Sequence, residues 1–508
     1  MTASNATLPD DPDLLKAMLL AERAESERLR LIIRELQRHR FGRRAESLPE
    51  EQLQLALEEA EQIEAAGLAQ SENPSERKAR AAKRRTNRGA LPLHLPRIET
   101  VIDVSSTTCP GCSGTLHRIG EDVSERLDIV PAQFRVLVVR RPKYACRTCE
   151  DVVVQAPAPT RLIEGGLPTE ATVAQVLVSK YADHLPLYRQ AQIYARQGVN
   201  LDRSTLADWV GRAAFLLRPV HQRLLDKLKA SSKLFADETT APVLDPGRGR
   251  TKTGQLFAYA RDDRPWGGSD PPGVAYVYAP DRKAAQPIAH LAGFRGILQV
   301  DGYAGYKVLA QRNEVSLAFC WSHVRRRFYE LAQSGPAPIA SEALQRIAAL
   351  YRIEDEIRGR SAGERVAVRQ ERSRPLVEAL QPWLREKLSL ISQKTKLAEA
   401  IRYALSRWAG LGFFLDDGRV EIDNNTVERA IRPIALNRKN ALFAGSDGGA
   451  EHWAVIASLI ETCKLIEIEP HGYLADVITR IVNGHPQSRL DELLPWAYPA
   501  TPKLKAVA

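Results

Sequence analysis

The sequence GILQVD, residues 296–301, is a short apolar run that begins with glycine and ends in an aspartate. A run of four to eight mainly apolar residues bounded by turn residues is typical of a buried strand. A similar run, LFAD, residues 234–237, lies upstream and also ends in an aspartate. The sequence therefore predicts two buried strands that end at Asp301 and Asp237.

The order of elements around these two strands predicts the sheet. Apolar runs at 255–260 and 273–278 and a helical segment at about 283–292 lie between them, and a fifth run, 315–320, follows. Three antiparallel strands, a helix and then a parallel strand is the order of a ribonuclease-H-like sheet. In that topology the first and fourth strands are neighbours, so we expect Asp237 and Asp301 at the same edge of the sheet.

A third carboxylate stands in the segment IDNNTVERAIRP, residues 422–433. We expect Asp423 to cap a helix and Glu428 to lie one turn inside it, with Asn424 and Arg432 on the same helix face. Pro433 is expected to end or kink this helix. The acids that compete with Glu428 for a functional role are Glu238, Glu421 and Asp423.

Three acids from three distant elements predict a metal site. Two divalent ions about 3.5–4 Å apart, as in nucleases and polymerases, must be bridged and neutralised by carboxylates. Oxygen ligands suit Mg²⁺ or Mn²⁺. Each acid taken alone is better explained as a turn residue or a helix cap. The combined pattern favours a catalytic triad of Asp237, Asp301 and Glu428 that also binds the metal.

Composition points to a nucleic-acid partner and excludes several classes of protein. The 508 residues carry a formal net charge of +10, and 44% are hydrophobic. The positive charge favours a polyanion such as double-stranded DNA. We expect no secretory signal and no membrane span. Six cysteines do not make a disulfide scaffold, so we expect a cytoplasmic protein with reduced thiols.

Four of the cysteines form two CxxC pairs. Cys109 and Cys112 flank Pro-Gly, and Cys146 and Cys149 follow downstream. A two-residue spacer lets both thiolates of a pair bind one tetrahedral ion, and four thiolates close its coordination shell. The pairs predict a structural Zn²⁺, with two unrelated pairs of free cysteines as the alternative. Cys320 and Cys463 stand alone and are interpreted as small buried apolar groups.

The predicted fold class is multidomain α+β. Residues 10–70 are interpreted as a helical coiled coil, or a helical hairpin packed on its own body, and residues 71–97 as a basic linker that is either solvated or bound to DNA. The remaining predicted parts are a small β zinc-binding domain at 98–160, a helical segment at 165–220, a catalytic domain at 232–460 with a helical insertion at about 330–415, and a small helical C-terminal element at 461–500.

Two helical segments carry possible DNA contacts. Residues 187–196 and 204–210 are helical and are separated by a turn with Gly198, which is typical of a helix-turn-helix or of an ordinary helical hairpin. In the first case Arg203 and Ser204 would reach a groove. A second segment after residue 320, expected to be capped by Ser322, carries His323 and Arg326, which either contact phosphates or form a solvated basic face.

At this point the chain resembles the large transposase of the insertion sequence 66 family of bacterial mobile elements. The resemblance rests on the Glu428 segment and on ordered motifs that span most of the length. These motifs are FGRRAE at 41–46, GEDVSERLD at 120–128, RPKYAC at 141–146, HLPLYR at 184–189 and VDGYAGY at 300–306. Position 45 departs from the pattern, where a serine would be closer.

The resemblance implies a leucine-zipper-like N-terminus, a zinc-binding domain, a DDE catalytic domain and a C-terminal element. It also implies metal-dependent cleavage and strand transfer at the ends of an insertion sequence, with Asp237, Asp301 and Glu428 as the triad. Two small accessory proteins of the same element are implied as partners, and so is a bacterial protein that associates with the nucleoid when it acts. We also expect a homo-oligomer.

Two other functions compete with an active transposase. One is a catalytically inactive zinc-containing DNA-binding protein or regulator. The other is a different ribonuclease-H-like nuclease, for example one that acts on RNA hybrids, which the N-terminal coil and zinc module fit poorly.

Overall fold

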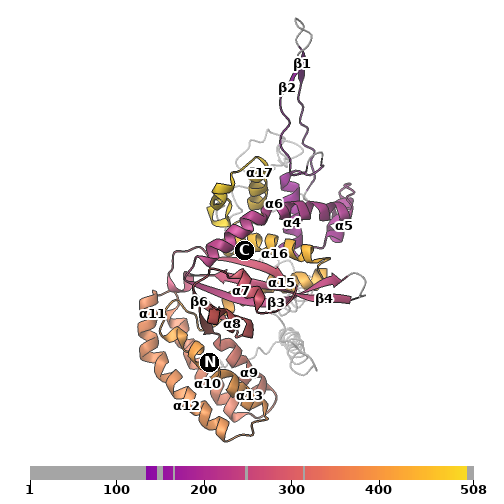
Figure 1. Ribbon diagram of the computed structural model, residues 1–508. Coiled ribbons are helices and arrows are strands. Elements are labelled where there is room, and N and C mark those ends of the chain that lie inside the picture. The colour runs from indigo at the N-terminus through magenta and orange to yellow at the C-terminus, as the bar shows by residue number, and fades with distance from the viewer. Residues whose placement is uncertain (1–132, 146–152, 164–165, 246–249, 313–314, 500–508) are drawn as a thin grey trace, which may run out of the picture. The chain divides into compact units, whose positions relative to one another are not determined.

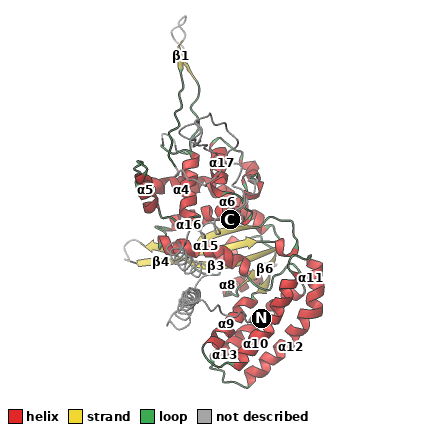
Figure 2. Cartoon of the chain, turned by 180° about the vertical axis from the view of Figure 1, so that it is seen from behind, coloured by secondary structure: helices red, strands yellow, loops and turns green. Residues whose placement is uncertain are grey.

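The computed structural model describes residues 133–145, 153–163, 166–245, 250–312 and 315–499 of the chain. The predicted coiled coil at 10–70, the basic linker at 71–97 and all four cysteines of the predicted zinc site lie outside these ranges. Within the described part, a five-stranded sheet is flanked by helices and joined to a helical insertion (Figures 1 and 2). The architecture is therefore mixed α and β, as the sequence predicts.

The sheet has the strand order β5-β4-β3-β6-β7. Its first three strands are antiparallel, and β6 and β7 run parallel to β3. The strand bounds are β3 Lys233–Asp245, β4 Arg250–Arg261, β5 Gly273–Ala279, β6 Gly296–Val300 and β7 Val315–Phe319. The predicted pairing of the first and fourth strands is confirmed, because β3 and β6 are hydrogen-bonded neighbours.

The prediction that the first strand ends at Asp237 is wrong. β3 continues for eight residues beyond it and stays paired with β4 up to Asp245, which lies opposite Arg250. Pairing with β6 stops earlier, at Phe235. Asp237 therefore lies just beyond the point where β3 stops pairing with β6, in the part of β3 that remains paired with β4.

Helices cover both faces of the sheet (Figure 1). On one face lie α6 (Arg203–Lys229), α15 (Asn425–Ala441) and α16 (Asp447–Leu465), and the Ser458 hydroxyl of α16 accepts the backbone N–H of Tyr276 in β5 at 2.8 Å. On the other face, His290 of α7 (Ala285–His290) pairs with the Tyr259 hydroxyl at 2.9 Å. The sheet is thus the centre of a three-layer core.

A helical region lies between β7 and α15, where the sequence predicts an insertion at about 330–415, and it has a hydrophobic core of its own around Trp321, Phe328 and Ile401. Its elements are α9 Trp321–Gln333, α10 Pro338–Ile357, α11 Ala362–Val368, a π-helical turn η2 Arg369–Ser373, α12 Arg374–Ser389, α13 Lys396–Leu405, α14 Trp408–Leu411 and η3 Phe413–Leu415. In Figures 1 and 2 these helices form a bundle beyond the β6–β7 edge of the sheet.

Residues before the sheet form a helical segment and a short strand pair. The helices are α4 Glu170–Tyr181, α5 Leu187–Arg196 and α6, and the strands are β1 Lys143–Ala145 and β2 Val153–Gln155. Residues 134–142 have no regular structure, and Val136 and Val138 are exposed.

The chain continues through α16 into α17 (Pro470–Val482), which packs on α4. Short 3-10 helices follow at Gln487–Leu493 (η4) and Pro495–Ala497 (η5). The sheet region also contains the α-helix α8 (Ala304–Arg312) and the 3-10 helix η1 (Arg264–Trp266). Over the described ranges, no helix is both long and apolar enough to cross a membrane.

Candidate active site

Strand register brings the first two predicted acids together. β3 and β6 pair in parallel with Lys233 opposite Ile297 and Phe235 opposite Gln299. The same offset carried two residues further places Asp237 level with Asp301. Carboxylate oxygens of Asp237, Asp301 and the adjacent Glu238 lie within 4.8 Å of one another. The predicted juxtaposition of two strand-borne carboxylates is therefore present.

Alternation along β3 separates the roles of Asp237 and Glu238. Successive residues of a strand point to opposite faces of the sheet. Asp237 lies opposite Ala258 of β4, and Ala258 lies opposite Tyr276 of β5, so the three side chains are on one face of the sheet. The Tyr276 hydroxyl donates to the Ala430 carbonyl of α15. Asp237 therefore shares the face that α15 covers.

Glu238 lies on the other face and is already paired. Its carboxylate forms an ion pair with Arg282 and accepts a hydrogen bond of 3.0 Å from the Tyr306 hydroxyl of α8. Its side chain is only 1% exposed. Glu238 is therefore better explained as a buried structural acid than as a replacement for Glu428.

The electrostatics of Asp237 favour a bound cation. Burial, and then the neighbouring charges of Asp301 and Glu238, raise the pKa of Asp237 to about 8, although a hydrogen bond from the Glu238 backbone N–H opposes the shift. The pKa of Glu238 is also raised by burial, against the effect of Arg282. Crowded carboxylates of this kind are stabilised by a divalent ion, which supplies the missing positive charge.

This crowding predicts a pH-dependent stability in the absence of divalent ions. Native Asp237 holds its proton up to about pH 8, whereas the unfolded chain releases it near pH 4, so the unfolding free energy of the wild type falls as pH rises between these values. Asp237→Asn removes the ionisable group, and we expect it to be more stable than the wild type at pH 8 by on the order of 1–3 kcal/mol.

Urea unfolding in EDTA at pH 5 and pH 8 measures this effect. Asp270→Asn is the matched control, because the Asp270 side chain is 58% exposed and remote from the crowded acids. Parallel pH dependences for wild type and Asp237→Asn would contradict the assignment of the shift to Asp237.

The third acid is carried by α15, whose start is tied to the sheet. Asn424 is completely buried and donates through Nδ2 to the carbonyl of Ala236, the residue before Asp237, at 3.2 Å. Asn424 is the N-cap residue of α15, so the prediction that Asp423 caps the helix is wrong by one residue, although the Asp423 carboxylate accepts the backbone N–H of Asn425 at 3.1 Å. Glu428 follows one turn in, and its charge contributes to the raised pKa of Asp237.

The prediction that Pro433 ends or kinks the helix is wrong in its first part, because α15 continues to Ala441 with Pro433 inside it. Proline removes one backbone hydrogen bond. Packing of Val427, Ala430 and Ile434 into the sheet core holds the helix on both sides of the proline.

Glu428 does not fall in one group with Asp237 and Asp301. Among the described residues, its carboxylate lies within 4.8 Å of ligand atoms of Cys320 and His323 instead, and Oε1 is 3.7 Å from His323 Nδ1. Ser322 was expected to cap the helix that carries His323, but Cys320 occupies the N-cap position and Ser322 lies inside α9. The structure thus brings two of the three predicted acids together and places the third in a neighbouring group.

Gln299 is a site residue that the sequence analysis missed. It is completely buried in β6, two residues before Asp301. Its Nε2 donates to the carbonyls of Glu421 and Asp423 at 2.7 and 2.6 Å, and its Oε1 accepts the Glu421 N–H at 3.2 Å. The only available signal was a polar residue inside the apolar run GILQV. Gln299 fixes the segment that leads into α15 against the strand that leads to Asp301.

Tyr403 is a second missed residue, and it comes from the insertion. Its hydroxyl donates to the Asp301 carbonyl at 2.9 Å. The guanidinium groups of Arg327 and Arg407 each lie 3.9 Å from the centre of its ring. Arg407 also donates to the Gly302 carbonyl at 3.3 Å. The insertion therefore supports the turn at Asp301 and brings two cations near it.

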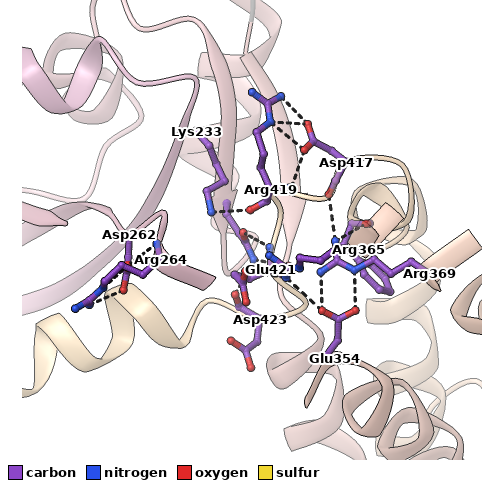
Figure 3. A network of polar contacts seen from close by, with 12 residues as sticks. Lys233, Asp262, Arg264, Glu354, Arg365, Arg369, Asp417, Arg419, Glu421 and Asp423 are labelled. Atoms are coloured by element: carbon purple, nitrogen blue, oxygen red, sulfur yellow. Dashed lines mark hydrogen bonds and ion pairs between the residues drawn. The ribbon is translucent and has the colours of Figure 1, made fainter. Parts of the chain in front are cut away.

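A buried ion network joins the insertion to the segment before α15 (Figure 3). Glu354 of α10 accepts two hydrogen bonds from Arg369, at 2.8 and 2.6 Å, and lies 3.4 Å from Arg365. Both arginine side chains are at most 1% exposed. Charges this deeply buried must be paired, because an isolated one is strongly disfavoured.

The same arginines reach the chain that leads to the site. Arg369 donates to the carbonyls of Phe414 and Asp417 at 2.9 and 3.2 Å, and Arg365 lies 2.9 Å from Glu421. Figure 3 also shows Lys233, at the start of β3, pointing to the Arg419 carbonyl, with Nζ 2.8 Å from the oxygen. Glu421, an alternative to Glu428, is thus part of this structural network.

Of the predicted DNA-contacting residues, the arginines and Ser204 are exposed and His323 is half-buried. Arg203 and Ser204 lie exposed at the start of α6, after a turn in which Gly198 has φ +80°. Arg326 is exposed on α9 and pairs with Glu330 at 3.1 Å, and Arg432 is exposed on α15, one turn beyond Glu428. His323 and Arg326 stand on α9 and Arg432 on α15, the helix that carries Glu428, whereas Arg203 and Ser204 stand on α6.

The amino-acid sequence matches the family model described as "Transposase IS66 family" over residues 165–452, which include Asp237, Asp301 and Glu428. The chain belongs to this transposase family. Models of three accessory regions of the same proteins also match: a leucine-zipper region described as "Transposase C of IS166 homeodomain" at 28–100, a zinc-finger binding domain at 106–150 and the IS66 C-terminal element at 458–496. The family assignment made from the sequence motifs is confirmed.

Relatives of this family transposase cover nearly its full length. It is 46% identical to the protein y4qI and 44% identical to y4jD, both from Sinorhizobium fredii (strain NBRC 101917 / NGR234), over 97% and 98% of this chain and 98% and 99% of the relatives. The names of these relatives state no activity. The family supports a transposase role, and its domains imply use of a divalent metal and of zinc.

Proposed function

We propose that this transposase cleaves DNA at the ends of an insertion sequence and joins the freed ends to target DNA, with Asp237, Asp301 and Glu428 as its catalytic carboxylates. The observation that carries the proposal is the parallel pairing of β3 with β6, which places two acids 64 positions apart at one level of the sheet. The strand order supports a ribonuclease-H-like catalytic domain.

The donor set fits Mg²⁺ or Mn²⁺, since it consists of carboxylates, and burial together with the charges of Asp301 and Glu238 raises the pKa of Asp237. Asp237 and Asp301 would hold the metal directly, and Glu428 would complete the site from α15. When bound, the ions would lower the pKa of a water or 3′-hydroxyl nucleophile and neutralise charge on the leaving oxygen.

The remaining residues of the site position the acids. Asn424 and Gln299 tie the start of α15 to β3 and β6, and Tyr403 supports the backbone at Asp301. Arg327 and Arg407, on the insertion side, and Arg432, beyond Glu428, supply positive charge that suits a phosphate backbone. These side chains orient DNA and carboxylates without taking part in proton transfer.

Outside the carboxylate site, we propose roles for the other predicted regions. Cys109, Cys112, Cys146 and Cys149 bind a structural zinc ion in the module that matches the zinc-finger family. The helix pair α5 and α6, with Arg203 and Ser204 exposed, recognises DNA as a helix-turn-helix. The N-terminal helices mediate self-association, and accessory proteins of the element assist the reaction.

Cleavage of a labelled duplex that carries the element's terminal inverted repeat tests the proposal. We expect nicking and strand transfer that require Mg²⁺ or Mn²⁺ and stop in EDTA, with no comparable cleavage of a duplex of scrambled sequence. Specific binding without cleavage at any divalent-ion concentration would instead support an inactive DNA-binding protein. Preferential cleavage of an RNA–DNA hybrid would support the nuclease alternative.

A further inference from the structure

A second group of metal-ligand side chains lies beside the proposed catalytic acids. Cys320 ends the connection from β7 to α9, His323 stands in the first turn of α9, and Glu428 in the first turn of α15. A sulfur, a ring nitrogen and a carboxylate oxygen from these three residues lie within 4.8 Å of one another. The group is distinct from the all-oxygen set of Asp237 and Asp301.

Two of the ligand atoms lack a partner. His323 Nδ1 and Glu428 Oε1 are both shielded from solvent and without a hydrogen bond, although they face each other at 3.7 Å. That separation exceeds the range of an N–H···O hydrogen bond. An unsatisfied buried polar atom destabilises the folded state. A cation placed between them would satisfy both atoms at once.

The thiol of Cys320 is held as a ligand would be. The residue is 2% exposed, and its Sγ accepts the backbone N–H of Asn424 at 3.2 Å and that of His323. Backbone N–H donors of this kind orient a metal-bound thiolate and compensate its charge. The other described cysteine that stands alone, Cys463, is equally buried but belongs to no such group within the described ranges.

We propose that Cys320, His323 and Glu428 bind a borderline or soft divalent cation, for which Zn²⁺ is the best match. Thiolate, imidazole and carboxylate are the three ligand types that zinc takes in proteins, whereas Mg²⁺ avoids sulfur. Three protein ligands leave a fourth position for water or a phosphate oxygen. Binding through Oε1 would orient the Glu428 carboxylate and leave its second oxygen available to the metal that Asp237 and Asp301 would hold. The proposal goes beyond the catalytic function, because it requires only these three ligands.

Metal content of the full-length chain tests this site. The protein is depleted of metal, reloaded with Zn²⁺, freed of excess ion and measured by atomic emission. We expect the wild type to hold one zinc ion per chain more than Cys320→Ala or His323→Gln. Cys463→Ala is the matched control for loss of a buried thiol and is expected to retain the wild-type zinc content. Zinc bound by the four CxxC cysteines is common to all four proteins and cancels in the comparison.

Reloading with Co²⁺ gives an independent readout. A cobalt–thiolate bond absorbs in the near ultraviolet, so the difference spectrum between wild type and Cys320→Ala isolates the bond to Cys320. His323 is partly exposed, with 30% of its side chain accessible, so His323→Gln decides the question even if Cys320→Ala fails to fold. Equal zinc content and equal cobalt spectra in wild type and His323→Gln would overturn the proposal.

The two proposals fail separately. Asp301→Asn lies outside this ligand set, and we expect it to keep the full zinc content while it loses cleavage. An active wild type whose zinc content is unaffected by His323→Gln would refute the zinc site and leave the catalytic function standing. Loss of zinc in His323→Gln, together with a wild type that never cleaves DNA, would support the zinc site and refute the proposed catalytic function.

Discussion

Asp301→Asn is expected to lower divalent-ion-dependent cleavage of element-end DNA by on the order of 10³-fold or more, the loss that removal of a direct metal ligand produces. The substitution keeps the size of the side chain and removes its charge. The Asp301 Oδ1 atom accepts the Tyr303 backbone N–H at 2.8 Å, and the asparagine oxygen can accept the same bond, so the turn after β6 is retained.

Single-turnover cleavage and a salt-controlled binding titration on the same duplex separate chemistry from affinity. Binding is expected to change by no more than about two-fold, because most of the affinity for DNA comes from Lys and Arg contacts to phosphates. Asp270→Asn removes an equally negative but exposed carboxylate from the same domain and should leave both quantities unchanged. Cleavage within a few-fold of wild type in Asp301→Asn would remove Asp301 from the triad.

Glu354→Ala is expected to destabilise the protein by about 3–5 kcal/mol, because it leaves Arg365 and Arg369 charged, buried and without their shared carboxylate. Arg369 also holds the carbonyls of Phe414 and Asp417, so the segment that leads to α15 loosens with it. Chemical unfolding followed by circular dichroism measures the loss, and cleavage is expected to fall together with stability.

Glu356→Ala is the matched control for this prediction. Glu356 stands on the same helix, two residues further on, and also pairs with an arginine, Arg372, but the two side chains are 52% and 45% exposed. Exposed pairs contribute little, so the unfolding midpoint should hardly move. Equal midpoints for Glu354→Ala and Glu356→Ala would show that the buried network does not stabilise the insertion.

Local patterns were sufficient for the sheet and for the identity of two acids. Apolar runs of strand length and the helix between the third and fourth of them predict the pairing of β3 with β6, because a parallel connection requires a crossover. The segment around Glu428 and the two CxxC pairs predict the third acid and the zinc module. The wrong predictions concern ends and caps. β3 extends past Asp237 and α15 extends past Pro433, while Cys320 and not Ser322 is the N-cap of α9, and Asn424 and not Asp423 is the N-cap of α15. Tertiary packing decides such boundaries.

The sequence by itself determined the order of the strands, the two carboxylates that follow the apolar runs and the family of the chain, because these depend on residues that are close together in the chain or on ordered motifs. Only the tertiary structure decided that Gln299 fixes the segment before α15, that Tyr403 supports Asp301 and that Glu428 lies against Cys320 and His323. Each of these contacts joins residues about a hundred or more positions apart, and only the packing of the helices on the sheet brings them together.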